Sequence, residues 1–328
     1  MHALATARSL TTSAPLPGGG RTRERFALLA RLAADDLTTA RVVEAHLDAV
    51  AVLAEHGTAP RALDPDSTWG VFAAESPDVR LDAVPAGDGW ELTGTKPWCS
   101  LAGRLSHALV TAHTGQGRRL FAVALGHPGV EVLAGRWHSR GLVDVPSGPV
   151  RFTAVTAEPV GDAGWYLRRP GFAHGGAGVA ACWFGGAVGV ARALRGGTRE
   201  PDQLAQWHRG SVDLDLDVAR LALEAAAEAI DGGRARGADG ELLAARTRAH
   251  VAAAAERVLT TVGHALGPAP LALDAAHAAR VADLTVYLRQ HHAERDVAGI
   301  GRATAATSHG AHGGQDHDPG RAGEGWPA

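Results

Sequence analysis

The spacing of apolar residues changes twice along this chain, and these two changes limit the folds that it can adopt. From Phe26 to Ala54 apolar side chains recur every three or four residues, which predicts an amphipathic helix that ends at Gly57. Between Trp69 and about Val155 the spacing becomes two, in short runs separated by Gly, Asp and Pro turn signals. The gaps between these runs are too short for crossover helices, so we expect an antiparallel sheet.

Helical spacing returns after Gly171 in long stretches, at about residues 175–195, 209–231, 239–266 and 273–299. The second of them ends at Asp231, which two glycines follow, as is typical of a helix stop. From Thr304 the sequence is Gly, His, Asp and Pro without periodicity, so we expect no ordered structure there. The predicted order is therefore helices, a small β-domain and a C-terminal four-helix bundle, which is an α+β multidomain class.

Composition narrows the function classes. Hydrophobic residues make up 45% of the 328 residues and charged residues 20%, with a formal charge of −3, which fits a soluble globular protein and excludes nucleic acid as a first partner. No apolar run is long enough to span a bilayer, and none near the N-terminus has the form of a signal peptide. Cys99 and Cys182 have no spaced partner for a disulfide or a cysteine-based metal site, so we expect no metal and a reducing cytoplasmic location.

Several local strings resemble the acyl-CoA dehydrogenase superfamily, from about Arg21 to Arg302. The most specific is residues 92–100, Leu-Thr-Gly-Thr-Lys-Pro-Trp-Cys-Ser, and residues 108–112 and 161–166 match the strand and the exit that follow it in the family. The resemblance implies a middle β-barrel between two helical parts.

We accordingly predict five segments along the chain. They are a flexible N-terminus at 1–20, a shortened helical domain at 21–66, the antiparallel β-barrel at 67–160, the four-helix bundle at 161–302 and a disordered tail at 303–328. The helical domain is about half as long as the resemblance implies, so a partner subunit could supply the missing wall of the site.

The resemblance also implies a bound FAD. Trp98 would lie against the isoalloxazine, with the Ser100 hydroxyl at its polar edge and Cys99 between them; a core tryptophan followed by a turn serine is the alternative. A second flavin-facing stretch would offer the backbone amides of Ala74 and Ser76, although the family's threonine and glycines are absent there. Gly267 would approach the pyrophosphate, or simply end a helix.

The catalytic base is where this chain departs from the family, whose dehydrogenases abstract the α-proton of an acyl thioester with a carboxylate while flavin N5 takes the β-hydride. Near residues 289–291, where that carboxylate is expected, the first acid is Glu294. A second family location for the base holds His174, either a neutral base or an ordinary histidine at a helix start. His291 and His292 resemble the His-bearing ends of monooxygenases that share the fold.

Three function classes therefore remain open. The first is an FAD-dependent acyl-CoA dehydrogenase acting on an acyl-CoA or related thioester, with an electron-accepting flavoprotein. The second is a flavin-dependent monooxygenase with a separate reductase, and the third is a non-catalytic subunit of a heteromeric dehydrogenase. The first agrees best with fold, length and residues 98–100, and the resemblance implies a homo-oligomer, or a heteromer with a related subunit, built from the C-terminal helices.

Overall fold

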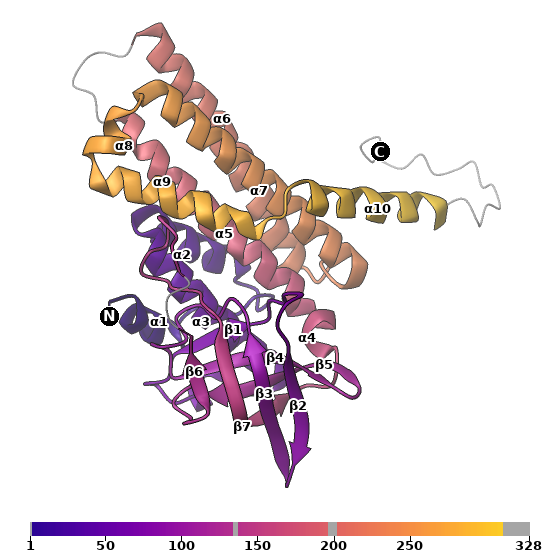
Figure 1. Cartoon of the computed structure of the whole chain (residues 1–328). Coiled ribbons are helices and arrows are strands. Elements are labelled where there is room, and N and C mark those ends of the chain that lie inside the picture. Colours follow the sequence, from indigo (N-terminus) through magenta and orange to yellow (C-terminus); the bar gives the residue numbers. More distant parts are fainter. Residues whose placement is uncertain (1, 134–136, 196–201, 311–328) are drawn as a thin grey trace, which may run out of the picture.

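The computed structural model describes residues 2–133, 137–195 and 202–310, and places a β-barrel at one end and long helices at the other (Figure 1). Three helices precede the barrel: α1 (His2–Leu10), α2 (Thr22–Asp35) and α3 (Leu37–His56). Asp36 separates α2 from α3, because its carboxylate accepts hydrogen bonds from the Thr38 and Thr39 amides and caps α3. The predicted single helix from Phe26 to Ala54 is thus two helices.

The predicted flexible N-terminus is wrong for the segment that forms α1. Ala7 is fully buried and belongs to the main helical core, and α1 packs beside α3. Residues 2–10 contain too few large apolar side chains to reveal an amphipathic face, so this helix depends on tertiary contacts more than on its own periodicity. Residue 1 lies outside the described residues.

The middle of the chain forms the predicted barrel, after a short 3₁₀ turn η1 (Pro60–Ala62). Its strands are β1 (Trp69–Phe72), β2 (Leu81–Ala86), β3 (Gly89–Lys96), β4 (His107–Thr114), β5 (Gly117–Ala124), β6 (Val130–Val132) and β7 (Val150–Val160). Strands β4, β2, β3, β7 and β5 pair in that order, and β5 returns to β4 to close a five-stranded barrel. β1 and β6 extend it at β4 and β7.

The barrel differs from the prediction in two pairings. β1 runs parallel to β4, with Trp69 opposite His107, and β2 meets β4 in parallel at Asp82 and His113. No crossover helix is needed for β1, because the β2–β3 hairpin separates it from β4 in the sequence. Apolar side chains of the strands fill the barrel, while α3 packs on its outside against Trp69 and Leu109.

The C-terminal part begins with α4 (Trp165–Arg168) and α5 (Pro170–Ala191), which continues into η2 (Arg192–Arg195). Two antiparallel helices follow, α6 (Gln203–Asp231) and α7 (Gly237–Leu266), and then α8 (Ala269–Leu273), α9 (Ala275–Tyr287), η3 (Leu288–Gln290) and α10 (Glu294–Gly310). Figure 1 shows α10 projecting away from the other helices. The predicted fourth helix, 273–299, is therefore interrupted, with Ala293 in the left-handed region at φ 45°.

The tail prediction also needs correction where α10 continues past residue 302 to Gly310, while residues 311–328 lie outside the described part of the chain. α5 is the central helix of the bundle. The span 170–195 is long and apolar enough to cross a membrane, but 67% of its most apolar window is buried inside the protein, as in a core helix. Gly185 lets α5 approach α2 closely, since an added methyl group would overlap the carbonyl oxygen of Ala30.

Candidate functional site

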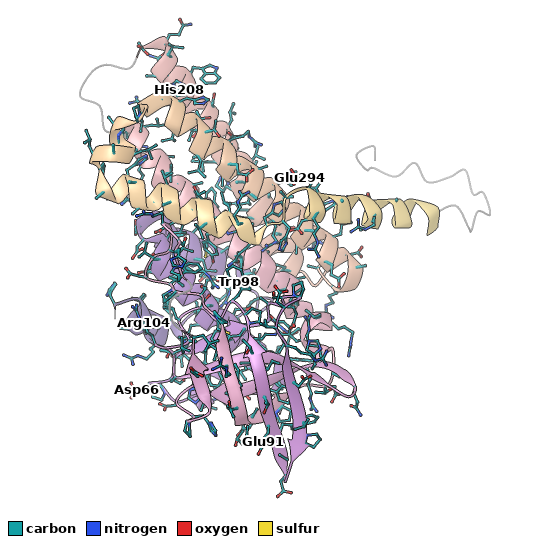
Figure 2. All side chains as sticks on the ribbon, viewed as in Figure 1. Asp66, Glu91, Trp98, Arg104, His208 and Glu294 are labelled. Atoms are coloured by element: carbon teal, nitrogen blue, oxygen red, sulfur yellow. The ribbon has the colours of Figure 1, made fainter. Side chains whose placement is uncertain are left out.

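The loop after β3 presents an exposed tryptophan at the junction of the barrel and the helices (Figure 2). Trp98 and Leu101 both have left-handed backbones, with φ 57° and 58°, a conformation that costs a non-glycine residue about 1 kcal/mol. The barrel holds the loop in place, because the Cys99 amide donates to the Gly148 carbonyl at 2.9 Å and the Leu101 amide to Pro146 at 2.8 Å. The Trp98 side chain remains 59% exposed, which is unusual for an indole.

Cys99 points the other way. Its side chain is 1% exposed within the barrel core, and its thiol donates to the Lys96 carbonyl at 3.3 Å. Burial raises the pKa of Cys99 to about 12, so the thiol is neutral and unreactive. The predicted contribution of Cys99 to cofactor binding can therefore come only from its backbone.

Ser100 faces α3 and links the barrel to the helices. Its hydroxyl lies 2.8 Å from the Ser147 hydroxyl and accepts a long hydrogen bond of 3.5 Å from Arg41 of α3. Arg41 also donates to Glu44 at 2.8 Å, and the Tyr287 hydroxyl of α9 donates to the same carboxylate oxygen at 3.0 Å. The barrel loop, α3 and α9 thus share one connected polar network.

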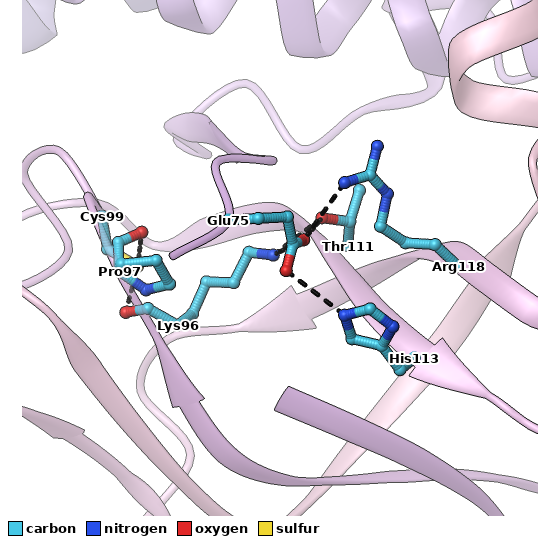
Figure 3. A network of polar contacts seen from close by, with 7 residues as sticks. All are labelled: Glu75, Lys96, Pro97, Cys99, Thr111, His113 and Arg118. Atoms are coloured by element: carbon cyan, nitrogen blue, oxygen red, sulfur yellow. Dashed lines mark hydrogen bonds and ion pairs between the residues drawn. The ribbon is translucent and has the colours of Figure 1, made fainter. Parts of the chain in front are cut away.

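A second network fixes the other predicted flavin-facing stretch (Figure 3). The Lys96 ammonium, at the end of β3, donates to Glu75 at 2.6 Å and to Thr111 at 2.8 Å. Arg118 and His113 approach the same carboxylate at 3.4 and 3.3 Å. Burial would raise the pKa of Glu75, but its hydrogen bonds and charge contacts, above all with Lys96, lower it below the usual value.

Glu75 thereby ties the segment with Ala74 and Ser76 to the strand that leads into Trp98. Ala74 is exposed, and Ser76 forms an isolated bridge with Val79. A shallow groove of about 450 Å³ lies beside this segment. It is lined by Glu75, Ser76, Pro77, Val79, Arg80 and His113. Both Ala74 and Ser76 were predicted to offer backbone amides to the flavin. Of the two, Ser76 lines this groove.

His174 lies inside the helical part, in the second turn of α5. It is 9% exposed, its Nε2 lies 3.0 Å from the Ala235 carbonyl, and Gly18 covers the ring. The glycines that follow it lie against three different helices. A methyl group added to Gly175 would lie 2.7 Å from Asp48 Oδ1 of α3, whereas Gly176 faces Arg248 of α7 and Gly178 faces α2. The surface of α5 beside these glycines is therefore covered by side chains of this chain.

His291 lies in a buried aromatic and cationic cluster between α5, α7 and α9. Its ring packs edge-on to the indole of Trp183, with 6.3 Å between the ring centres. The Arg248 guanidinium lies over the same indole, 4.6 Å from its centre. Trp183 also packs edge-on to Tyr287, so this cluster adjoins the network of Ser100. Burial lowers the pKa of His291 from its usual value, although Asp296 opposes this, so burial favours the neutral imidazole.

Two polar atoms of this cluster are buried without a hydrogen bond, although Asp296 Oδ2 lies 3.9 Å from His291 Nε2. The His291 Nε2 and the Trp183 Nε1 have no hydrogen-bond partner among the residues that the structure describes. Because an unpaired buried polar atom costs about 1–3 kcal/mol, such atoms concentrate where a ligand or water completes the site. Glu294, by contrast, is exposed on the first turn of α10 (Figure 2).

Gly267 lies apart from all of these residues. It follows α7 with φ 65°, and Figure 1 shows the junction of α7 and α8 at the end of the bundle far from the barrel. No described atom lies within 4 Å of the position that a β-carbon would take at Gly267. Within one chain it cannot share a site with Trp98. Across the described segments, no group of three or more His, Cys, Asp or Glu side chains is arranged to hold a metal ion.

Comparisons with known proteins follow the fold. No family model matches the sequence, and no curated protein matches it. KijD3, solved with FMN and dTDP-3-amino-2,3,6-trideoxy-4-keto-3-methyl-D-glucose, matches with a TM-score of 0.77 and 19% identity over 95% of this chain and 88% of its own. Glutaryl-CoA dehydrogenase from Mycobacterium smegmatis matches with a TM-score of 0.74 and 19% identity, over 88% and 82%. The chain has the acyl-CoA dehydrogenase fold.

A third match has the same fold with another activity. The dibenzothiophene monooxygenase TdsC from Paenibacillus sp. A11-2, solved with FMN and indole, gives a TM-score of 0.76 and 17% identity over 93% of this chain and 96% of its own. The acyl-CoA dehydrogenase fold therefore carries both dehydrogenases and monooxygenases among the proteins that this chain resembles. At these identities the likeness extends to the fold alone, so activity has to be argued from the site.

Sequence reasoning missed the residues that connect the site. Arg41 and Glu44 stand three residues apart on a predicted helix, a spacing typical of a surface ion pair, yet their side chains are only 15% and 10% exposed. No sequence pattern singled out Arg248, because it donates to backbone carbonyls far away in the sequence, those of Gly176 in α5 and of Gln290. The single lysine, Lys96, was visible inside the most specific string, but only the fold shows that it anchors Glu75.

Proposed function

We propose that this chain is a flavin-dependent oxidoreductase that holds the isoalloxazine ring against Trp98, where the barrel meets the helices. The observation that supports this best is the exposed indole on a loop held in a strained conformation, in the string that resembles the family's flavin loop. Covering about 100 Å² of that indole is worth about 2.5 kcal/mol. Ser100 would meet the polar edge of the ring, and the backbone near Ser76 its flank.

The fit of the residues to a flavin rests on chemistry present in this chain. A flat apolar surface, a hydroxyl and buried unpaired nitrogen atoms at Trp183 and His291 suit a planar heterocycle with polar edges, together with a second planar molecule. We propose a flavin without specifying FAD, because Gly267, expected at the pyrophosphate, lies at the end of α7 and away from Trp98. It can serve an FAD only across a subunit interface, so FMN and FAD are both to be tested.

For the reaction, we propose monooxygenation in preference to dehydrogenation of an acyl thioester. The observation that favours it is His291, a buried imidazole in the segment where the resemblance expects a catalytic carboxylate, while Glu294 lies exposed on α10. When bound, the reduced flavin would supply the electrons that let one oxygen atom of O₂ enter the substrate and the other leave as water. His291 would hold or release a proton at Nε2, and Trp183 would orient its ring.

The test begins with flavin uptake. Titration of the protein with FMN and with FAD, followed by flavin fluorescence, should give a saturable complex with at least one of them. The flavin should then be reduced by an added NAD(P)H-dependent reductase, and oxygen consumption should follow when a planar heteroaromatic compound is present. Anaerobic bleaching by a panel of acyl-CoA thioesters would instead support the dehydrogenase, and a protein that takes up neither flavin would support the non-catalytic subunit.

The role of His291 is tested by a matched pair of variants. His291→Asn should lower product formation at least tenfold while the flavin dissociation constant stays within about twofold. Glu294→Gln, an exposed neighbour at the start of α10, should leave both quantities unchanged. Equal losses in the two variants, or none in either, would contradict the assignment of His291.

A further inference from the structure

A groove of about 330 Å³ lies between α2, α5 and α6. The two helices α2 and α5 meet beside it, because Gly185 of α5 packs directly against the backbone of Ala30 in α2. Phe26 and Leu223 line the groove and are buried, so they form its floor, and the half-buried Phe184 forms a wall. The inside of the groove is therefore apolar.

The rim of the groove is cationic. Arg23 and Arg31 of α2 and Arg220 of α6 line it, and Glu224 is the one acid among its described lining residues. Glu224 accepts hydrogen bonds from Arg23 at 2.6 Å and from Arg220 at 2.9 Å, and Arg220 also pairs with Asp217. Arg31 is exposed and has no hydrogen bond or ion pair with any residue in the described ranges. One guanidinium beside the groove is thus left without an acid.

The size of the groove decides what kind of partner it fits. Its volume is at the lower end of the range of small-molecule sites, about 300–1,000 Å³. Nine residues line it, whereas a protein partner would cover about 20–30 residues. The small side chains of Ala27 and Ala30 leave room for a chain beside Phe184. A narrow apolar groove with a free guanidinium at its edge is complementary to an alkyl chain that ends in an anion.

We propose that this groove binds a single-chain anionic amphiphile, such as a fatty carboxylate. The alkyl chain lies on Phe26, Phe184 and Leu223, and the carboxylate accepts hydrogen bonds from Arg31.

This site is separate from the residues of the proposed flavin site. Phe184 follows Trp183 directly in α5, and neighbouring side chains on a helix point about 100° apart, so α5 presents one to the groove and the other to the cluster with His291. No lining residue of the groove contacts Trp98 or Ser100 in the described structure. The inference is therefore independent of the proposed function, and its test uses the protein without flavin.

The test is calorimetric titration of the protein with octanoate and decanoate below their micelle-forming concentrations. We expect one molecule bound per chain. Full burial of one methylene group favours binding about fourfold, and the groove is open to solvent, so decanoate should bind at least about fourfold more tightly than octanoate. Decylamine, which has the same chain and a positive charge, should bind at least about tenfold more weakly than decanoate. Equal affinities for decanoate and decylamine, or no saturable binding of decanoate, would overturn the proposal.

Two rim variants should change the affinity for decanoate in opposite directions. Arg31→Gln removes the free guanidinium and should weaken binding about fivefold, while the affinity for octanol stays the same. Glu224→Gln removes the acid that competes for Arg23 and Arg220, so it should strengthen binding at least about twofold. Arg302→Gln, at an exposed arginine on α10, is the control for net charge and should have no effect. Equal changes in all three variants, or none in the two rim variants, would contradict a carboxylate at this rim.

The position of the alkyl chain is tested by filling the groove. Arg23 and Arg31 also line a neighbouring groove between α1 and α2, so the two grooves have to be distinguished. Ala30→Leu obstructs the proposed groove alone and should abolish saturable binding of decanoate, whereas Ser13→Leu obstructs the neighbouring groove alone and should leave it unchanged. Thermal unfolding verifies that each variant folds, and the two rim variants decide if Ala30→Leu does not. Unchanged binding in folded Ala30→Leu would overturn the assignment of this groove.

Discussion

His46 shows how one buried side chain ties three segments together. Its Nδ1 accepts a hydrogen bond from the Trp69 amide at 3.1 Å, so the ring proton is on Nε2 and is donated to Thr11 Oγ1 at 2.9 Å. The histidine thereby joins α3 to β1 and to the chain after α1. Both nitrogens are committed in the neutral form, and the side chain is 1% exposed. Protonation would remove the acceptor that the Trp69 amide needs.

We predict an acid-sensitive loss of stability from this residue. Burial lowers the pKa of His46 from 6.5 to about 4, so the unfolded chain binds the proton more readily than the folded one. Stability is complete above the unfolded pKa and falls as the pH drops from about 6.5 to about 4, by about 3 kcal/mol. Denaturant unfolding of wild type and His46→Gln across this range checks it; the exposed His56→Gln should follow wild type, and parallel curves for all three would contradict the prediction.

Trp98 gives a second prediction at the level of a single residue. Because the indole is exposed, Trp98→Ala should change the stability of the apo protein by no more than about 0.5 kcal/mol. The same change should weaken flavin binding roughly thirtyfold, equivalent to about 2 kcal/mol of lost stacking. Trp98→Phe should recover most of the affinity. A large loss of apo stability with unchanged flavin affinity would show a structural role instead.

Among the helices, close contact between α2 and α5 depends on glycine. We predict that Gly185→Ala lowers the free energy of unfolding by at least about 2 kcal/mol, because the backbone of α2 must move away from the new methyl group. Gly210 in α6 is the matched control: it faces open space, so Gly210→Ala should stabilise the protein by up to about 1 kcal/mol. Chemical denaturation of both variants measures the difference, and equal effects would contradict close α2–α5 packing.

Elements with strong periodicity could be predicted from the sequence, and elements that depend on tertiary contacts could not. The barrel strands and the helices now seen as α5, α6 and α7 followed their apolar spacing, with shifts at the ends. The break after Tyr287 escaped notice, because residues 289–292 continue a plausible helical pattern until Ala293 adopts a left-handed backbone. The parallel pairing of β1 could not be seen, because register between distant strands leaves no local trace.

For the molecule as a whole, the site was only partly predictable. The string at residues 92–100 identified the loop that carries Trp98 and Ser100, because it combines a turn, a strand end and an aromatic residue. The residues that hold it, Arg41 and Glu44, come from a helix more than forty positions away, and no spacing rule connects them to Ser100. Conversely, sequence spacing grouped Glu294 with His291, whereas the chain turn at Ala293 carries Glu294 to the surface.

The exposed surface of α6 predicts that the protein self-associates. Its exposed apolar residues follow a seven-residue repeat: Leu204, Trp207, Leu214, Val218 and Leu221, each at least 49% exposed. If a second copy covers this face, Leu214→Glu combined with Val218→Glu should convert a dimer or larger assembly into monomer. Light scattering after size exclusion measures the mass. Leu273→Glu on α8, 85% exposed, is the control, and a monomeric wild type at micromolar concentration would contradict the prediction.

The enclosure of the only lysine has a practical consequence. Lys96 is 1% exposed, and its ammonium lies against Glu75 and Thr111, so amine-directed dyes and cross-linkers will meet little besides the α-amino group of the chain. A label introduced this way would sit at one defined point. Lys96 itself can be acylated only when the segment with Glu75 moves away from its ammonium. The rate of Lys96 acylation, measured by mass spectrometry, would therefore report how often that segment opens.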